Sequence, residues 1–266
     1  MPTRTSPILL AVVASLIVAL PAAAQLPDRL DCGDDYGRDD REHFCEVREV
    51  RLDARDALAV DGHQNGGVRV AGWDRNEIVL QAKIQTWARQ ADEARALAQA
   101  VRIETDDVIR PAGPQTERRQ SWGVSFLIFV PRNTDLDIET HNGGISLSDV
   151  SGRIRFNARN GGIRLTGLSG DVRGRTTNGG LHVQLTGDRW QGAGLDIRTT
   201  NGGVRLHIPE NYSANLETGT VNGGLNIDFP VTVQGRIGRE LTTTLGQGGA
   251  TVRVTTTNGG VRIARN

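Results

Sequence analysis

The tripeptide Asn-Gly-Gly occurs seven times in this chain of 266 residues, and the residues around it repeat with it. An apolar residue stands three positions after each asparagine, and a second apolar residue stands two positions further on. This alternation predicts a half-buried strand after every tripeptide, and a similar alternation predicts a strand before most of them. Because asparagine and glycine accept backbone conformations that other residues avoid, each tripeptide is expected to form a tight turn. The turns begin at Asn65, Asn142, Asn160, Asn178, Asn201, Asn222 and Asn258.

Two all-β architectures can contain such turns. Asn-Gly is a strong hairpin signal, so an antiparallel β-meander is one alternative. The spacing favours a right-handed β-solenoid, that is, a β-helix-like repeat. From Asn142 the copies are 18, 18, 23 and 21 residues apart, and the additional residues fall at 187–194 and 209–215, each between the strand after one turn and the next strand. Loops that leave one corner of each coil are typical of solenoids.

One segment departs from the strand pattern. Residues 86–101 carry apolar side chains at a helical period, among good helix formers, so one inserted helix is expected near these residues. A helix here would cover an open end or a face of the strand array, where exposed edges invite aggregation. At the other end of the chain, residues 261–263 are expected to form an edge coil.

The first 24 residues have the features of a secretory signal peptide. Arg4 precedes an apolar run over residues 8–20, and Ala22, Ala23 and Ala24 offer a small-residue cleavage site. The run is shorter than the roughly 20 residues that span a bilayer, so the mature protein is not expected to cross a membrane. The expected route is the general secretory (Sec) pathway, and the expected location is the periplasm, the cell surface or the medium.

Residues 25–46 are predicted to be an acidic segment held by a disulfide. Cys32 and Cys45 are the two cysteines of the chain, and an exported protein meets an oxidising environment. The two cysteines are thirteen positions apart, and a disulfide that closes a loop of this size stabilises the folded state by about 3 kcal/mol in the chain-entropy model. A solvated segment is favoured over a calcium loop, because the acidic residues fit no established ligand spacing. Residues 47–266 are then the β-repeat domain.

Taken together, these motifs resemble a known family. Repeated Asn-Gly-Gly-(Ile/Leu/Val)-x-(Leu/Val/Ile), after a signal peptide and an alanine-rich helix, is similar to the bacterial putative-adhesin family, also called the toast-rack domain, over residues 47–263. The resemblance implies a β-helix-like fold, no enzymatic activity and no established ligand. The repeat departs from its pattern at Gly174, Thr218 and Gln247, which leaves the register of the late coils open.

The main alternative function is a polysaccharide lyase or hydrolase, since β-helices host such enzymes. These need paired carboxylates, or acidic calcium ligands beside a base. The outward acids Asp137, Glu139, Asp196 and Glu217 are separated by coils that carry arginine, and the five histidines take different repeat positions. No enzyme, cofactor or metal site is therefore expected. The net charge is zero, with 31 basic and 31 acidic residues, which argues against nucleic acid as a partner.

Two features are candidate ligand contacts. Arg164, His182 and Arg205 occupy one outward column, which could bind an anionic glycan or could be a solvated polar face. Trp190, in the 187–194 loop, could contact a carbohydrate or protein, or could fold back onto the coil edge. The expectation is an exported, non-catalytic binding or structural module of the cell envelope, whose partner is an envelope glycan or a protein.

Overall fold

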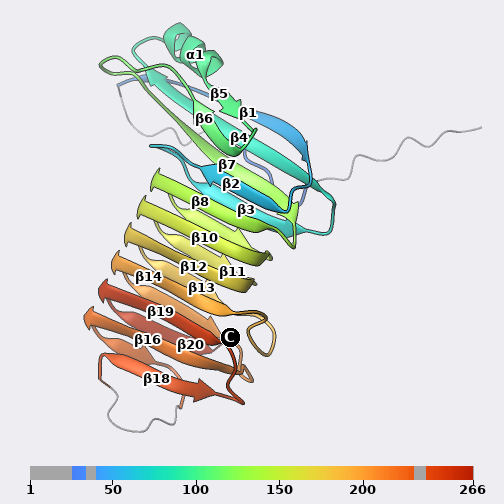
Figure 1. Cartoon of the computed structure of the whole chain (residues 1–266). Coiled ribbons are helices and arrows are strands. Elements are labelled where there is room, and N and C mark those ends of the chain that lie inside the picture. The colour runs from blue at the N-terminus through green and yellow to red at the C-terminus, as the bar shows by residue number, and fades with distance from the viewer. Residues whose placement is uncertain (1–25, 34–39, 231–237, 266) are drawn as a thin grey trace, which may run out of the picture.

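The chain folds into two large β-sheets and one short helix, as seen in a computed structural model that describes residues 26–33, 40–230 and 238–265 (Figure 1). Each sheet has ten strands. In spatial order, sheet A contains β1 (Glu42–Asp53), β4 (Glu77–Ala88), β7 (Ser121–Pro131), β3 (Val68–Trp73), β9 (Ile145–Ser148), β11 (Ile163–Thr166), β13 (Leu181–Gln184), β15 (Val204–Ile208), β20 (Val261–Arg265) and β17 (Leu225–Ile227). Sheet B contains β18 (Glu240–Leu245), β16 (Ala214–Asn222), β19 (Thr251–Asn258), β14 (Gly194–Asn201), β12 (Ser169–Asn178), β10 (Ser151–Asn160), β8 (Asp135–Asn142), β2 (Ala57–Asp61), β6 (Val108–Ala112) and β5 (Arg102–Glu104).

The chain alternates between the two sheets at the repeated tripeptides. Strand β8 of sheet B ends at Asn142, and β9 of sheet A begins at Ile145. The same step joins β10 to β11, β12 to β13, β14 to β15, β16 to β17 and β19 to β20. Neighbouring repeat strands pair in parallel, with equivalent residues in register, as in Asn160 beside Asn142 and Asn178. The antiparallel meander is therefore wrong, because the strands that flank each tripeptide lie in different sheets.

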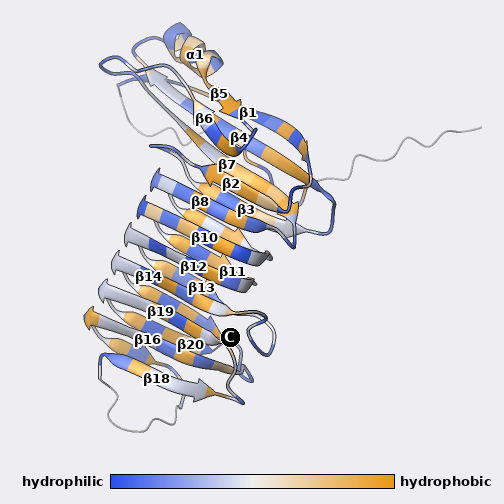
Figure 2. Ribbon diagram, in the orientation of Figure 1, coloured by the Kyte–Doolittle hydropathy of each residue, from blue (hydrophilic) through white to orange (hydrophobic). Residues whose placement is uncertain are grey.

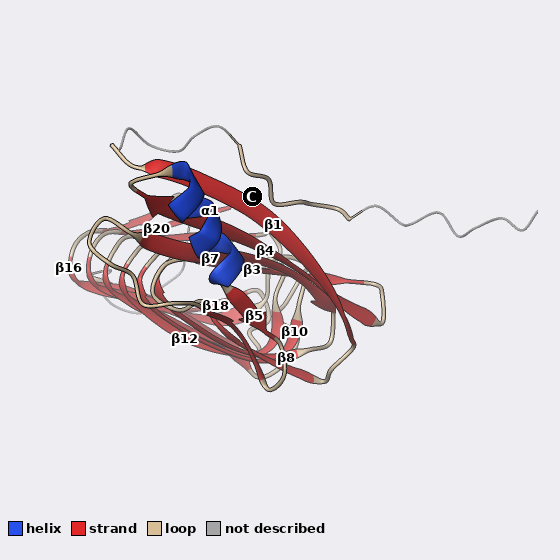
Figure 3. Cartoon of the chain, turned by 90° about the horizontal axis from the view of Figure 1, so that it is seen from above, coloured by secondary structure: helices blue, strands red, loops and turns tan. Residues whose placement is uncertain are grey.

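The core fills the space between the sheets. Apolar side chains at alternate positions of both sheets form one continuous buried cluster that extends from Leu58 to Ile263. Figure 2 shows this alternation as apolar and polar bands along the strands, and Figure 3 shows the two sheets facing each other along the stack. The short alternation in each repeat therefore accounts for the two-layer packing.

The last coil is not at the edge, which corrects the expectation for residues 261–263. Strands β19 and β20 lie between the coil of β14 and β15 and the coil of β16 and β17, and β18 then pairs antiparallel with β16. This order places Arg253 between Asp196 and Glu217, with nitrogen–oxygen distances of 3.4 Å and 2.5 Å. In chain order the two carboxylates would face each other on adjacent strands, and like charges there destabilise a sheet.

Helix α1 (Ala91–Ala100) is shorter than the 86–101 segment expected, because strand β4 continues to Ala88. The helix lies at one end of the molecule, where Ala94, Leu97 and Ala98 are buried against β1 and β4 (Figure 1). Arg48 donates hydrogen bonds to the carbonyl oxygens of Ala98 and Val101 at 3.0 Å and 2.6 Å. These bonds add side-chain donors to carbonyl oxygens at the helix C-terminus.

The N-terminal segment is tied to sheet A. A disulfide joins Cys32 to Cys45 of β1, and Leu26 packs with Trp73 and Phe129 on the outer face of the sheet. The part that is described, residues 26–33, is thus partly packed and not wholly solvated. Residues 1–24, expected to be a signal peptide, and the acidic residues 34–39 lie outside the described residues, and the expected domain boundary at 46/47 falls inside β1. Within the described ranges, no helix has the length and apolarity needed to cross a bilayer.

Candidate functional site

The seven repeat asparagines form one hydrogen-bonded ladder along the corner between the sheets. The side-chain amide of each asparagine except Asn65 donates to the amide oxygen of its neighbour, at 2.8 Å in five contacts and 3.3 Å between Asn142 and Asn65. The ladder joins equivalent turns in register and uses one N–H and one oxygen lone pair of each interior amide. In spatial order it contains Asn65, Asn142, Asn160, Asn178, Asn201, Asn258 and Asn222.

A row of buried threonines supports the same corner. The hydroxyl of Thr176 donates to the carbonyl oxygen of Gly161 at 2.8 Å, and the hydroxyl of Thr199 donates to that of Gly179 at 2.7 Å. These threonines are between 2% and 3% exposed. Because a buried hydroxyl needs a partner, the row is part of the core packing and of the corner. Thr220 and Thr256 make equivalent bonds, while Thr140 donates to the carbonyl oxygen of Gly143 in its own turn.

The two glycines of each tripeptide have different surroundings. A Cβ atom added to the first glycine, such as Gly161, would lie 2.1 Å from the carbonyl oxygen of Gly143 in the next coil. A Cβ on the second glycine, Gly162, would meet its nearest atom, the carbonyl oxygen of Gly180, at 3.5 Å. The first position therefore needs glycine for close stacking, while Gly162 at the second position has room for a Cβ on the outer face of sheet A.

The second glycines form the floor of a long groove across sheet A. The groove has a volume of about 1380 Å³ and crosses β3, β9, β11, β13, β15, β20 and β17. On β7 and β4, Ser125 and Lys83 stand in line with the second glycines. Their side chains end the glycine floor there. None of the described residues that line the groove is Asp or Glu. The repeat spacing alone gives no sign of this groove, but the glycine at the second position of every tripeptide is the signal that could have found it.

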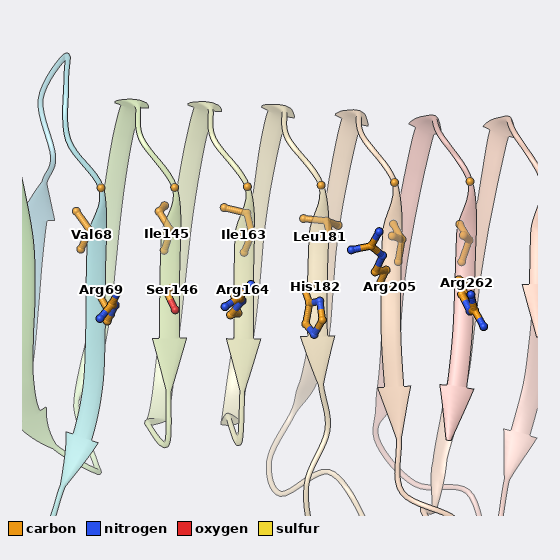
Figure 4. Close-up of a pocket in the computed structure, with 18 of the residues that line it drawn as sticks. Val68, Arg69, Ile145, Ser146, Ile163, Arg164, Leu181, His182, Arg205 and Arg262 are labelled. Atoms are coloured by element: carbon orange, nitrogen blue, oxygen red, sulfur yellow. The ribbon is translucent and has the colours of Figure 1, made fainter. Parts of the chain in front are cut away.

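One wall of the groove is a row of polar side chains, one from each strand (Figure 4). The predicted contacts Arg164, His182 and Arg205 are in register on β11, β13 and β15, so the structure brings them together. The row continues on both sides at the same repeat position, although sequence reasoning did not single out these further members. In spatial order it contains Arg69, Ser146, Arg164, His182, Arg205, Arg262 and Asn226.

The charges at the two ends of the row are neutralised within the chain. Arg69 pairs with Asp28 at 2.6 Å, and Arg262 pairs with Asp228 at 2.8 Å. Arg164 and Arg205 are exposed, and neither forms an ion pair with any carboxylate in the described part of the chain. Arg164 and Arg205 therefore hold the unpaired positive charge in the middle of the groove, and Lys83 on β4 is a further cation at its end.

His182 lies between these two arginines. Burial lowers the pKa of His182, and the neighbouring His207, Arg164 and Arg205 lower it further. The imidazole stacks on that of His207 with ring centroids 5.3 Å apart. At neutral pH His182 is thus an uncharged hydrogen-bonding group between two cations, and it gains charge only in acid.

Trp190 is not an exposed contact, which corrects one of the two interpretations considered for it. The side chain is 6% exposed and belongs to the main apolar cluster. Its indole nitrogen donates to the carbonyl oxygen of Gly170 at 3.0 Å. The loop therefore folds the ring back onto the coil edge, because an indole buries much apolar area once its N–H has a partner.

Three outward carboxylates of sheet B, those of Asp171, Asp196 and Glu217, are engaged with arginines. Asp171 accepts from Arg155 and Arg173 at 2.8 Å and 3.0 Å, and Glu217 pairs with Arg253. The arginines on both sides hold the pKa of Asp171 below its usual value, with the Arg155 hydrogen bond as the largest cause. Among the described residues, no group of three or more His, Cys, Asp or Glu side chains could hold a metal ion. These three acids thus act as ion-pair partners.

The Toastrack DUF4097 family model matches residues 130–264, so the chain belongs to that family. No curated protein matches the sequence.

Solved structures give weaker likenesses. A "putative cell adhesion protein" from Clostridium sporogenes ATCC 15579 is 12% identical with a TM-score of 0.41, over 83% of this chain and 100% of that one. A "putative adhesin" from Bacteroides fragilis NCTC 9343 is 9% identical with a TM-score of 0.36, over 84% of this chain and 97% of that one. A "Putative lipid binding protein" from Parabacteroides distasonis ATCC 8503 is 8% identical with a TM-score of 0.27, over 83% and 97%. At these scores the likenesses carry no argument about ligands.

Proposed function

We propose that this protein is an exported, non-catalytic module of the cell envelope that binds an extended, anionic partner along the groove of sheet A. The observation that carries the proposal is the groove itself, which crosses the strands from β3 to β17, reaches β7 and β4, and is lined by cations and by no described carboxylate. A long surface of one charge sign attracts and orients a ligand of the opposite sign.

A rigid scaffold suits such a role. We propose that the repeat region is a right-handed β-solenoid in which the Asn-Gly-Gly tripeptides are the turns. The parallel in-register pairing and the alternation between two sheets support this description, and parallel strand crossovers are almost always right-handed. A solenoid holds its outward rows at a constant spacing, which presents a regular surface to a polymer.

Export is supported by the N-terminal sequence and by the disulfide. The charged and apolar stretches of residues 1–24, followed by three alanines, have the order of a signal peptide. Disulfides such as Cys32–Cys45 persist in oxidising compartments and are rare in the cytosol. We propose Sec export, removal of residues 1–24, and a periplasmic or surface location for residues 25–46 and the repeat domain 47–266.

We also propose that the protein binds its ligand without cleaving it. A lyase or hydrolase on the same scaffold remains the alternative, with Asp137 and Asp196 as its outward carboxylates. The engagement of Asp196 with Arg253 and Arg198 supports the binding role over catalysis, because a paired carboxylate is less available as a base.

The test combines fractionation with a binding and turnover assay. We expect the full-length protein in the periplasm or outside the cell, and we expect the mature form to retain acidic polysaccharides without producing new chain ends. Recovery in the cytoplasm with intact residues 1–24 would contradict export. New chain ends that disappear with Asp137→Asn or Asp196→Asn would establish the enzyme instead.

A further inference from the structure

The ends of the cationic row show how it holds a carboxylate. Asp28 reaches Arg69 from the N-terminal segment, and Asp228 reaches Arg262 from the end of β17. Both pairs lie on the outer face of sheet A, at 2.6 Å and 2.8 Å. Arginines of this row thus bind carboxylates within the chain. Arg164 and Arg205, in the middle of the row, have no carboxylate partner among the described residues.

The spacing of the free arginines restricts what can bind. Arg164 lies on β11 and Arg205 on β15, and β13 with His182 lies between them. Two strand spacings put the two residues about 9.6 Å apart along the stack. That distance is close to the length of one disaccharide in an extended polysaccharide.

We propose that Arg164, His182 and Arg205 form a subsite for a linear polysaccharide that carries one carboxylate per disaccharide. The sugar chain would lie across the strands, over the glycine floor, with one carboxylate on each guanidinium and with His182 between them. Guanidinium groups suit this task because they bind carboxylates in a bidentate manner. The inference rests on the proposed function, since an exported module meets envelope polysaccharides.

The groove favours a sugar over other linear polyanions. Single-stranded nucleic acid needs aromatic platforms for its bases, but the one Phe, Tyr or Trp among the described lining residues is Phe126, which is 1% exposed. Peptides are usually recognised at a free sheet edge or through apolar pockets, and this groove crosses the face of the sheet over glycines. The groove instead offers hydroxyl and amide groups, from Ser146, Asn226 and Gln85, that can bond to sugar hydroxyls.

The experiment measures the binding of hyaluronan fragments to mature protein by calorimetry at low salt. Hyaluronan has one carboxylate per disaccharide, so the tetrasaccharide can engage both arginines and the disaccharide only one. We expect the tetrasaccharide to bind at least about tenfold more tightly than the disaccharide. The double variant Arg164→Gln with Arg205→Gln should bind the tetrasaccharide about tenfold more weakly than the parent. The matched control is Arg175→Gln with Arg198→Gln, which changes the net charge equally on sheet B and should leave binding unchanged.

A second variant tests the path of the sugar without removing charge. In Gly162→Leu the added side chain stands on the groove floor, where a Cβ has room, so the fold should persist while tetrasaccharide binding is lost. Circular dichroism and thermal melting check the fold of every variant.

Other outcomes overturn the inference. Equal binding by the Arg164/Arg205 variant and the parent, no binding of any hyaluronan fragment, or stronger arginine-dependent binding of oligothymidylate or poly-glutamate would each do so. These results leave the envelope module itself standing, because that proposal is judged by fractionation, by retention of acidic polysaccharides from the wider panel, and by the absence of turnover on that panel.

Discussion

The backbone of Gly161 lies against that of Gly143 so closely that an added Cβ on Gly161 would be 2.1 Å from the Gly143 carbonyl oxygen. The same approach recurs at Gly179, Gly202 and Gly223, each against the first glycine of the adjacent coil. Neighbouring backbones cannot separate here without breaking the ladder of parallel hydrogen bonds. The first glycine of the tripeptide is therefore a requirement of stacking.

Alanine substitutions at Gly161 and Gly162 should show that stacking requires the first glycine of the tripeptide and not the second. We expect Gly161→Ala to lower the free energy of unfolding by about 3 kcal/mol, as overpacking against a fixed backbone does. Gly162→Ala, whose Cβ meets only a carbonyl oxygen at 3.5 Å, should change it by less than about 1 kcal/mol. Urea unfolding of both variants checks this, and equal effects would contradict the assignment of close contact to the first glycine.

The contribution of each asparagine to the free energy of unfolding should depend on its position in the ladder. Asn160 makes two ladder hydrogen bonds, to Asn142 and from Asn178, whereas Asn222 at the end makes one, to Asn258. At about 1 kcal/mol for each bond, Asn160→Ala should cost about twice as much as Asn222→Ala. The exposed Asn211, in the loop before β16, is a control whose replacement by alanine should change stability by less than about 0.5 kcal/mol. Chemical denaturation measures all three, and a larger loss at Asn222 than at Asn160 would argue against the ladder.

The repeat predicts much of this architecture. Equivalent residues of equal repeats lie side by side when strands stack in parallel register, so the row of Arg164, His182 and Arg205 could be derived from position alone. The all-β class and the helix follow from local patterns. The members Arg69 and Arg262 stand at the same repeat position and could have been included.

Other features depend on contacts between distant segments. The placement of the last coil is set by β19 pairing with both β14 and β16, and by Arg253 between two carboxylates, which no local pattern encodes. The burial of Trp190 depends on the carbonyl of Gly170 in another coil. The neutralisation of Arg69 depends on Asp28, in a segment held by the disulfide.

Gly174 interrupts the inward apolar column of sheet B because Phe156 fills its place. A Cβ on Gly174 would lie 2.1 Å from the Phe156 ring, which is 4% exposed. We expect Gly174→Ala to destabilise by about 2 kcal/mol, and Phe156→Leu to destabilise by about 1 kcal/mol. The double variant should be less destabilised than the sum by at least about 1 kcal/mol, since the smaller side chain makes room. Additive effects in a double-mutant cycle would contradict this direct competition for space.

His182 should make the protein less stable in acid. Its pKa is lowered in the folded state, by burial first and then by His207, Arg164 and Arg205. The unfolded chain, with a histidine pKa near 6.5, then binds more protons than the folded chain, so the free energy of unfolding falls as pH falls below about 6.5. His182→Asn removes this contribution, and the variant should lose less stability than the parent between about pH 7 and pH 5. His141→Asn, which alters a histidine outside the row, serves as the control. Denaturant titrations across this range measure the slopes, and parallel pH profiles for the His182 variant and the parent would show that His182 is not a source of the acid sensitivity.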